Sequence, residues 1–265
     1  MKRYLAFLSI LVLVLASVPY KADAALATNL VSYWKMDESS GNPADSVGSN
    51  TLTNLNTTAF GAAKINNGAD IETSSTQGFR ITDAAQSGLD FSDALTFAMW
   101  IKFESTPAGE ITFIVKRVGS GNQRSYFWKM NSTTAVGFLW YTDGSTIGGN
   151  LSVSWTPSTD TWYHIAVTKS GTTVKFYVNG AQQGLDQTGS NATIHNGTAP
   201  FEIGQWIDDV GNFDGFTDEV GVWSRALTLA EISSLYNAGA GCAHPFTACE
   251  SAATKSDDTL FQVLD

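Results

Sequence analysis

Residues 215–239 constrain the fold most, because the spacing of their apolar side chains changes from that of a strand to that of a helix within one short stretch. Alternate residues of a strand share one face. In the first half of the stretch that face is mostly apolar and consists of Phe216, Asp218, Val220 and Val222. The alternation therefore predicts a half-buried strand late in the chain, with one carboxylate, Asp218, on its apolar face.

The second half of the stretch predicts a short, well-capped helix. Thr228 is a good N-cap residue, and Glu231 three positions later completes the pattern of a capping box. Leu227 before the cap and Ile232 after it have the spacing of a hydrophobic staple. The residues expected on one apolar stripe are Leu229, Ile232, Leu235 and Tyr236. Gly239 is placed to end the helix.

The rest of the chain predicts many short strands separated by polar turns. Charged residues make up only 15% of the chain and aromatic residues 12%, a composition that favours a sandwich over a helix bundle. Strands are expected at residues 30–37, 78–82, 95–103, 110–118, 125–130, 135–141, 162–169, 173–178, 181–185, 201–206 and 216–223. Strands at this spacing, with one short helix near the end, predict an all-β sandwich.

Residues 1–24 have the pattern of a signal peptide. A basic start precedes an apolar run over residues 5–18, and the small residues Ala22 and Ala24 precede the expected cut. The run is shorter than the roughly 18 to 20 apolar residues of a membrane span, and a retained membrane anchor is the alternative. We expect a secreted protein that is extracellular, on a cell surface or periplasmic, with no membrane span after cleavage.

The charge balance argues against a nucleic-acid partner. The chain has 15 Lys and Arg residues against 25 Asp and Glu residues, and its formal net charge is −10. Such a chain has no surplus of cations with which to neutralise phosphates. An acidic surface is compatible with solubility or with binding of divalent cations, and it proves neither.

The chain contains two cysteines, Cys242 and Cys249, close together after the predicted helix. In an exported chain this spacing predicts a local disulfide that closes a small loop. A metal or redox pair is the weaker alternative, because His244 is the only other potential ligand nearby and the spacing matches no zinc motif.

Five segments occur in an order that points to one family: LVSYWKMDESSGN, ADSVGSN, LTFAMWIKF, WYHIAVT with VKFYVNG, and FTDEVGVWSRALTLAEISSLYNAG. Together they resemble the laminin G-like, concanavalin A-like jelly-roll family of exported proteins over residues 30–239. The resemblance implies a jelly roll of two antiparallel sheets packed face to face, with the first and last strands adjacent in one sheet. We expect this domain over residues 25–241 and a tail over residues 242–265. It also implies a domain that binds glycans or proteins, often with one structural calcium ion.

Asp218 raises the question of that ion, because an isolated buried charge is very costly. Calcium takes six to eight oxygen ligands. The resemblance places Asp218 beside the N-terminal strand, where Asp37 and Asp45 are neighbours and the backbone of residues 46–50 offers carbonyls. The sequence leaves two hypotheses open. Either these three carboxylates bind Ca²⁺, or Asp218 caps backbone amides or pairs with Arg225 while the other two form turns.

A glycan ligand needs exposed aromatic faces surrounded by hydrogen-bonding groups. Tyr126, Trp140 and Trp206 are the predicted aromatic residues of such a face, and Arg124 is placed to supply hydrogen bonds. For each ring taken singly, packing in the core is the alternative.

The sequence lacks the pattern of a glycoside hydrolase, which needs two carboxylates facing one cleft. The Glu-x-Asp-x-x-Glu strand of related laminarinases is absent, and the adjacent residues Asp218 and Glu219 should point to opposite faces. We therefore expect a secreted, non-catalytic binding module for carbohydrate. The alternatives are a cell-surface structural or adhesive component that contacts proteins, and a hydrolase or lyase on the same fold.

Overall fold

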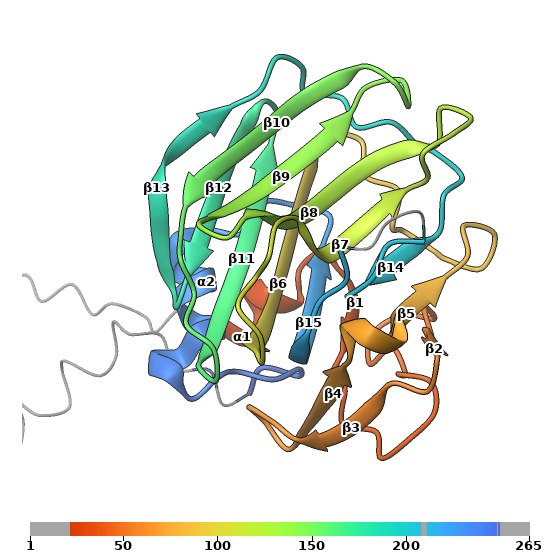
Figure 1. Ribbon diagram of the computed structural model, residues 1–265. Coiled ribbons are helices and arrows are strands. Elements are labelled where there is room, and N and C mark those ends of the chain that lie inside the picture. The colour runs from red at the N-terminus through yellow and green to blue at the C-terminus, as the bar shows by residue number, and fades with distance from the viewer. Residues whose placement is uncertain (1–21, 208–210, 248, 250–265) are drawn as a thin grey trace, which may run out of the picture.

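The computed structural model describes residues 22–207, 211–247 and 249. Its strands form two antiparallel sheets packed face to face (Figure 1). The eight-stranded sheet contains β1 (Leu30–Trp34), β3 (Ala59–Ala62), β4 (Asn67–Ile71), β6 (Ala94–Phe103), β11 (Trp162–Ser170), β12 (Thr173–Val178), β13 (Ala181–Thr188) and β15 (Gly215–Trp223). The seven-stranded sheet contains β2 (Thr53–Leu55), β5 (Gly78–Ile81), β7 (Ile111–Arg117), β8 (Arg124–Ser132), β9 (Ala135–Tyr141), β10 (Ile147–Ser154) and β14 (Phe201–Ile203).

The order of the strands confirms the predicted sandwich. One sheet runs β13-β12-β11-β6-β15-β4-β3, with β1 paired to β15, and the other runs β10-β9-β8-β7-β14-β5-β2. The first and last strands are therefore adjacent, as the resemblance implied, and Ser32 of β1 lies opposite Val222 of β15. Because these pairings join distant parts of the chain, the closing strand holds the two ends of the fold together.

The strands β2, β3, β4 and β10 lie outside the predicted ranges. They are short or rich in Gly, Asn and Ala, and β10 reads IGGNLSVS. Such sequences have little intrinsic preference for a strand, so pairing with neighbours decides their structure. The predicted strand at residues 201–206 ends early, at Ile203, because Gly204 has a φ of +76° and turns the chain.

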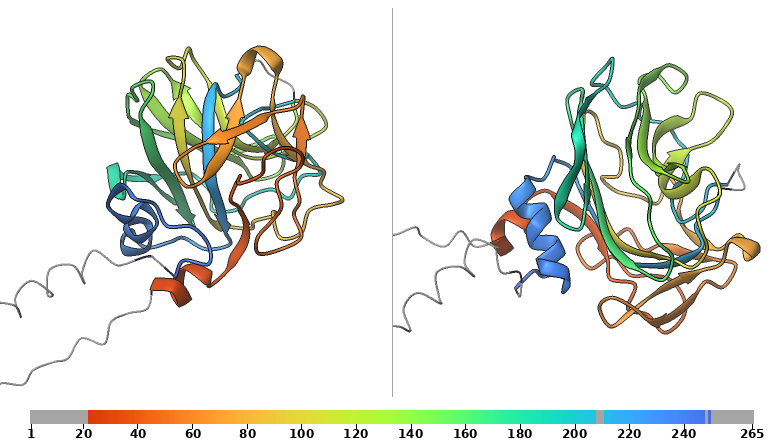
Figure 2. Two further views of the ribbon diagram at one scale, coloured as in Figure 1. Left: turned by 90° about the horizontal axis from the view of Figure 1, so that it is seen from below. Right: turned by 60° about the vertical axis from the view of Figure 1, so that its left-hand side comes forward.

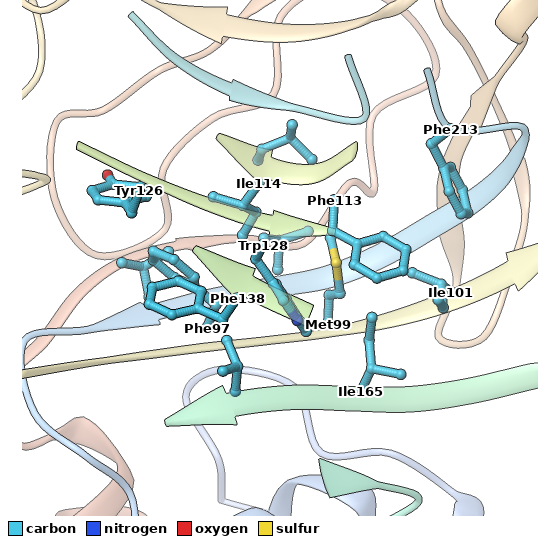
Figure 3. Close-up of a cluster of buried hydrophobic side chains, with 14 of the residues drawn as sticks. Phe97, Met99, Ile101, Phe113, Ile114, Tyr126, Trp128, Phe138, Ile165 and Phe213 are labelled. Carbon is cyan, nitrogen blue, oxygen red and sulfur yellow. The ribbon is translucent and has the colours of Figure 1, made fainter. Parts of the chain in front are cut away.

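Large aromatic side chains fill the space between the sheets (Figure 3). Phe97 of β6 lies 6.2 Å from Trp128 of β8, and Phe113 of β7 lies 5.3 Å from the same ring, measured between centroids. All three are buried. Tyr126 belongs to this core as well, and its hydroxyl donates a hydrogen bond of 2.8 Å to the carbonyl of Leu89.

A second apolar cluster covers the outer face of the eight-stranded sheet. It joins α1 (Ala22–Ala27), α2 (Leu229–Tyr236) and the loop that Cys242 and Cys249 close, called the cysteine loop below. Both helices lie on this side of the sandwich (Figure 2). Trp223 lies at its centre and donates its indole N–H to the carbonyl of Leu26 at 2.7 Å. Cys242 and Cys249 lie at disulfide distance, with 5.4 Å between their Cα atoms.

The capping box of α2 is confirmed. Thr228 accepts the backbone N–H of Glu231, and the Glu231 carboxylate accepts the backbone N–H of Thr228. Two details of the prediction are wrong. Leu229 is 52% exposed, so it does not belong to the apolar stripe. The helix ends at Tyr236, and Asn237, rather than Gly239, takes the left-handed backbone that caps it.

The predicted signal peptide falls mostly on residues 1–21, which lie outside the described residues. Ala25 and Leu26, immediately after the expected cut, are buried, and Leu26 belongs to the second cluster. Within the described residues, no helix has the length and apolar character needed to cross a membrane.

Removal of the cap should destabilise the fold measurably. Thr228→Ala leaves the N–H of Glu231 without its partner, and we expect the free energy of unfolding to fall by about 1 kcal/mol. Chemical denaturation of the wild type and the variant measures this difference. Thr228→Ser, which keeps the hydroxyl, should lose much less. Equal losses in both variants would show that the hydroxyl is not the stabilising group.

His164 should make the stability depend on pH. It is buried between Trp100 and Tyr236, and this burial lowers its pKa to about 3. Between the folded pKa of about 3 and the unfolded histidine pKa of about 6.5, the unfolded chain therefore binds a proton that the folded chain does not. The contribution of the neutral imidazole is complete above about pH 7 and is lost as the pH falls toward 3.

Comparison with His164→Gln isolates this effect. Melting temperatures measured from pH 7 to pH 4 should fall more steeply for the wild type than for the variant, because only the wild type has an imidazole to protonate on unfolding. Parallel curves for the two proteins would contradict the assignment.

Candidate functional site

The predicted face of Asp218 is wrong, because β15 contains a β-bulge. The pairing of β15 with β6 shifts between Asp218 and Gly221, and Glu219 takes a left-handed backbone with φ +51°. Val220 and Val222 point into the core between the sheets. Asp218 lies opposite Trp100, whose ring is on the outer face beneath α2. The bulge therefore turns Asp218 away from the core.

Asp218 is completely buried on that outer side. Its Oδ2 accepts the backbone N–H of Ile65 at 2.8 Å, and its Oδ1 has no hydrogen-bond partner among the described residues. Burial is the main cause that raises the pKa of Asp218 to about 9, and the charges of Glu219 and Asp37 act in the same direction. Because the ionised form lacks enough partners, this carboxylate needs a proton or a cation.

Glu219 points to the same side as Asp218, which corrects the expectation of opposite faces. It lines a cavity of about 10 Å³ together with Tyr33, Trp100 and His164. Burial raises the pKa of Glu219 to about 7. Neither carboxylate is exposed to a substrate.

Asp37 and Asp45 occupy different surroundings. Asp45 accepts three backbone N–H groups, from Tyr33, Val47 and Asn50, at 3.0 to 3.1 Å, and so stabilises the turn after β1. Asp37 accepts only weak hydrogen bonds of 3.2 to 3.3 Å from the neighbouring Asn67 and Asn66. Asp37 is near enough for its charge to raise the pKa of Asp218. The position of Asp45 is explained by its backbone amide partners.

Arg225, the alternative partner of Asp218, is engaged elsewhere. Its guanidinium forms two hydrogen bonds to Glu231, of 2.9 and 2.7 Å. It also donates to the carbonyls of Ala25 and Thr28. Arg225 thus ties the N-terminal segment to the start of α2.

Two of the three predicted ligand aromatics lie in the core. Tyr126 and Trp140 are fully buried and point between the sheets. The indole of Trp140 donates to the carbonyl of Asn191 at 3.0 Å, and Gly148 and Gly149 of β10 lie so close that a Cβ has no room. Neither ring can present a face to a glycan, because their strand positions point inward.

The neighbouring residues of the same strands face outward instead. Phe127, next to Tyr126, and Tyr141, next to Trp140, form a third cluster on the outer face of the seven-stranded sheet. Trp206 joins them, 5.5 Å from the Phe127 ring between centroids. A shift of one residue along a strand moves a side chain to the opposite face. The sequence alone indicated the aromatic strands but not which of their rings face outward.

Cationic side chains lie over these outward rings. The guanidinium carbon of Arg117 is 4.1 Å from the centroid of the Trp206 ring and 5.8 Å from that of Tyr141. Arg124 lies 5.6 Å from the Tyr141 ring, and Lys129 lies 4.9 Å from the Phe127 ring. These distances are in the range of cation–π contacts. Arg117 and Lys129 were not among the predicted residues. Alternation along the neighbouring strands is the signal that places them here.

A pocket of about 330 Å³ opens beside Trp206. Its walls combine the indole of Trp206 and the exposed aliphatic side chain of Ile207 with several amide or hydroxyl groups. The lining residues are Leu55, Asn56, Thr76, Arg80, Gln205, Trp206, Ile207 and Asn212. Arg80 is held in place by the fully buried Glu202, 2.6 Å away. Trp206 is itself only 8% exposed, so it forms part of the wall rather than a protruding platform. The outer face of the seven-stranded sheet is the candidate site.

Two further features lie close by and differ in chemistry. A groove of about 320 Å³ is lined mainly by residues 105–111 and 211–214, and its one ring, Phe103, is buried. Carboxylate oxygens of Asp70, Glu72 and Glu104 all lie within 4.8 Å of one another. Burial raises the pKa of Asp70 and of Glu104. Sequence reasoning missed this cluster, because β4 and the end of β6 meet only through their pairing with β15.

Solved structures with this architecture include several binding domains. Domain 4 of AbnA, a GH43 extracellular arabinanase from Geobacillus stearothermophilus solved with arabinotriose, aligns with a TM-score of 0.58 and 20% identity, covering 77% of this chain and 97% of that one. The binding domain of Paraclostridial Mosquitocidal Protein 1 aligns with a TM-score of 0.65 and 16% identity, covering 81% of this chain and 53% of that one. At these identities the likeness establishes the fold.

A curated relative is the adhesion G-protein coupled receptor V1 of Danio rerio, which is 27% identical over 152 residues. The match covers 54% of this chain and 2% of the receptor, so it concerns one small part of a far longer protein. Residues 73–233, more than half of the chain, match the laminin G-type family described as the concanavalin A-like lectin/glucanases superfamily. The chain belongs to that family.

Proposed function

We propose that this protein is an exported, non-catalytic module that binds a carbohydrate on the outer face of its seven-stranded sheet. The observation that carries the proposal is the pocket beside Trp206, which combines an indole with amide, hydroxyl and guanidinium groups. A sugar presents an apolar ring face and a rim of hydroxyl groups, so it needs both kinds of partner at once. The arabinotriose bound in the AbnA domain supports a glycan as ligand.

The position of the pocket is consistent with this proposal. The outer face of the eight-stranded sheet is covered by α1, α2 and the cysteine loop, whereas the seven-stranded sheet carries the pocket and the cationic aromatic cluster. Its volume of about 330 Å³ falls in the usual range of small-molecule sites. One or a few sugar units are therefore the expected ligand.

The arrangement of carboxylates around the pocket differs from that of a glycosidase, which favours binding over hydrolysis. A glycosidase needs an acid and a base or nucleophile on opposite sides of the scissile bond. Among the described residues that line the pocket, none is Asp or Glu. The nearby Glu202 is fully buried and occupied by Arg80, Gln205 and the N–H of Ile207. Glu202 therefore holds these three lining residues in position.

Filling the pocket should abolish glycan binding. Ile207 lines the pocket and is 48% exposed, so Ile207→Trp should block the space without disturbing the core. Binding to arabinan, glucans and a glycan array should weaken. Titration calorimetry should give an affinity at least 10-fold lower than that of the wild type.

Leu229→Trp provides the matched control, because Leu229 is equally exposed at 52% but lies on α2, on the other sheet's side. That variant should bind as the wild type does. If the folded wild type binds no glycan with or without calcium, the proposal fails. Self-association or capture of a protein ligand would then favour the adhesive alternative.

We also propose a structural calcium ion at Asp218. The unpartnered Oδ1 of this buried carboxylate fits a cation, and the nearby charge of Asp37 offers a second oxygen ligand. Asp45 fits less well, since backbone amides already explain its position. Bound calcium would neutralise the buried charge and link β15 to the segment after β1.

Asp218→Asn tests the ion. If calcium binds, chelation should lower the melting temperature of the wild type and leave the variant unchanged. At a free calcium concentration of about 100 times Kd, the ion should add about 2.7 kcal/mol to the stability of the wild type. A wild type that is insensitive to chelator would refute the ion. A variant that remains as sensitive as the wild type would place the ion elsewhere, for example at Asp70.

A further inference from the structure

A lysine side chain points into the space between the two sheets. Lys116 of β7 lies opposite Tyr126 of β8 and Phe201 of β14, and both of these rings belong to the core. Residues directly opposite each other in antiparallel strands share one face. The Lys116 side chain therefore shares theirs, and it has no exposed surface. Because a lysine is almost never fully buried unless its ammonium group is paired, the groups around its Nζ atom decide what this residue does.

Two carboxylates meet at this nitrogen. The Oδ1 atoms of Asp83 and Asp90 lie 2.8 and 2.9 Å from Nζ, and their side chains are only 27% and 28% exposed. The carbonyl of Gly197 accepts a third hydrogen bond. Gln86 donates to Oδ2 of Asp90 at 2.7 Å and reaches Asp83 only weakly, at 3.5 Å. One amine and two acids are thus held together at a nitrogen that solvent does not reach.

This set of groups has the parts that amide formation between two side chains requires. An ion pair needs one carboxylate, as Lys129 has in Glu110. At Lys116 a second carboxylate is present, and it can carry protons while the first reacts with the amine. Contacts near 3 Å hold reactants in a near-attack arrangement, where the effective molarity reaches about 10⁵ to 10⁸ M. Exclusion of water also suppresses the reverse reaction, which is hydrolysis of the new bond.

We propose that Lys116 and Asp83 form an intramolecular amide bond after the chain folds, with Asp90 as the proton carrier. Asp90 accepts a proton from Nζ and passes it to an oxygen of Asp83, and the neutral amine attacks Cγ of Asp83. The Nζ–Cγ bond forms and one Cγ–O bond breaks. That oxygen leaves as water with two of the three ammonium protons, so the atoms balance without a further reactant. Asp90 ends as a carboxylate, as it began.

The hydrogen bonds assign the two roles. Asp90 is fixed by the bond from Gln86 with its other oxygen directed at Nζ, which suits a group that carries protons and keeps its place. Asp83 has only the weak contact with Gln86 and is free to pivot toward the nitrogen. Asp83 follows β5 by two residues, and β14 lies between β5 and β7 in the sheet. The amide therefore ties together the two sides of β14, and it does not depend on the proposed carbohydrate site.

Tryptic mapping of the folded, full-length protein tests the bond. Trypsin does not cut after an acylated lysine, so residues 103–117 should stay in one peptide that is joined to the peptide 81–102. The joined species should be lighter than the two peptides together by the mass of one water, and its fragment ions should place the link at Asp83. Cleavage after Lys129, the ion-paired lysine of the same sheet, should be normal in the same digest.

Three variants separate the amide from an ordinary ion cluster. Asp90→Asn keeps the shape of the side chain but cannot carry a proton, so the joined peptide should form about 100-fold more slowly after refolding. Lys116→Arg keeps the positive charge and should give no joined peptide. Asp83→Asn should give the same joined peptide as the wild type, because its side-chain nitrogen leaves as ammonia in place of water. Melting temperatures of the three variants show whether each is folded.

The wild type alone can overturn the proposal. Cleavage after Lys116, with the peptides 81–102 and 103–116 recovered separately, would refute the amide whether or not the variants fold. A link found at Asp90 would refute Asp83 as the acylated residue, and equal rates in Asp90→Asn and the wild type would refute Asp90 as the proton carrier. None of these results bears on glycan binding, so failure of this proposal is distinct from failure of the carbohydrate-binding module.

Discussion

The pairing of β15 with β6, β4 and β1 is the interaction on which the fold depends. It joins the two ends of the chain in one sheet and carries a bulge at Glu219. The extra residue keeps Val220 and Val222 in the core while it turns two carboxylates to the outer side. A bulge costs local pairing, and here it also buries Asp218, whose Oδ1 lacks a partner. That cost is the strongest physical reason to expect a cation or a proton at this position.

The two sheets differ in what covers their outer faces. Trp223 anchors a cluster in which the two helices and the cysteine loop cover the eight-stranded sheet. Such a covered face stabilises the fold and is unavailable to a ligand. The seven-stranded sheet instead places Phe127, Tyr141 and Trp206 beneath cations and beside a polar pocket. The proposed ligand site uses the pocket beside Trp206, which combines an indole with polar groups.

Alternation along β8 and β9 decides which of their aromatic side chains lie on the outer face. Tyr126 and Trp140 supply packing between the sheets, and their neighbours Phe127 and Tyr141 supply the outward rings. Arg124 was predicted at the site and does lie there, but its partner Arg117 comes from a different strand. The position of two guanidinium groups over the ring of Tyr141 arises only when β7, β8 and β9 are paired.

Much of the fold was determined by the sequence alone, because the responsible interactions are local. The alternating segments of β6, β9, β11 and β12, the capping box of Thr228 and the near cysteine pair all act within a few residues. The tertiary structure decided the rest: the weak strands β2 to β4 and β10, the bulge at Glu219, the burial of Tyr126 and Trp140, and the meeting of Arg117 with Arg124. Each of these depends on which strand lies beside which and in what register, and a shift of one residue reverses the face that a side chain presents.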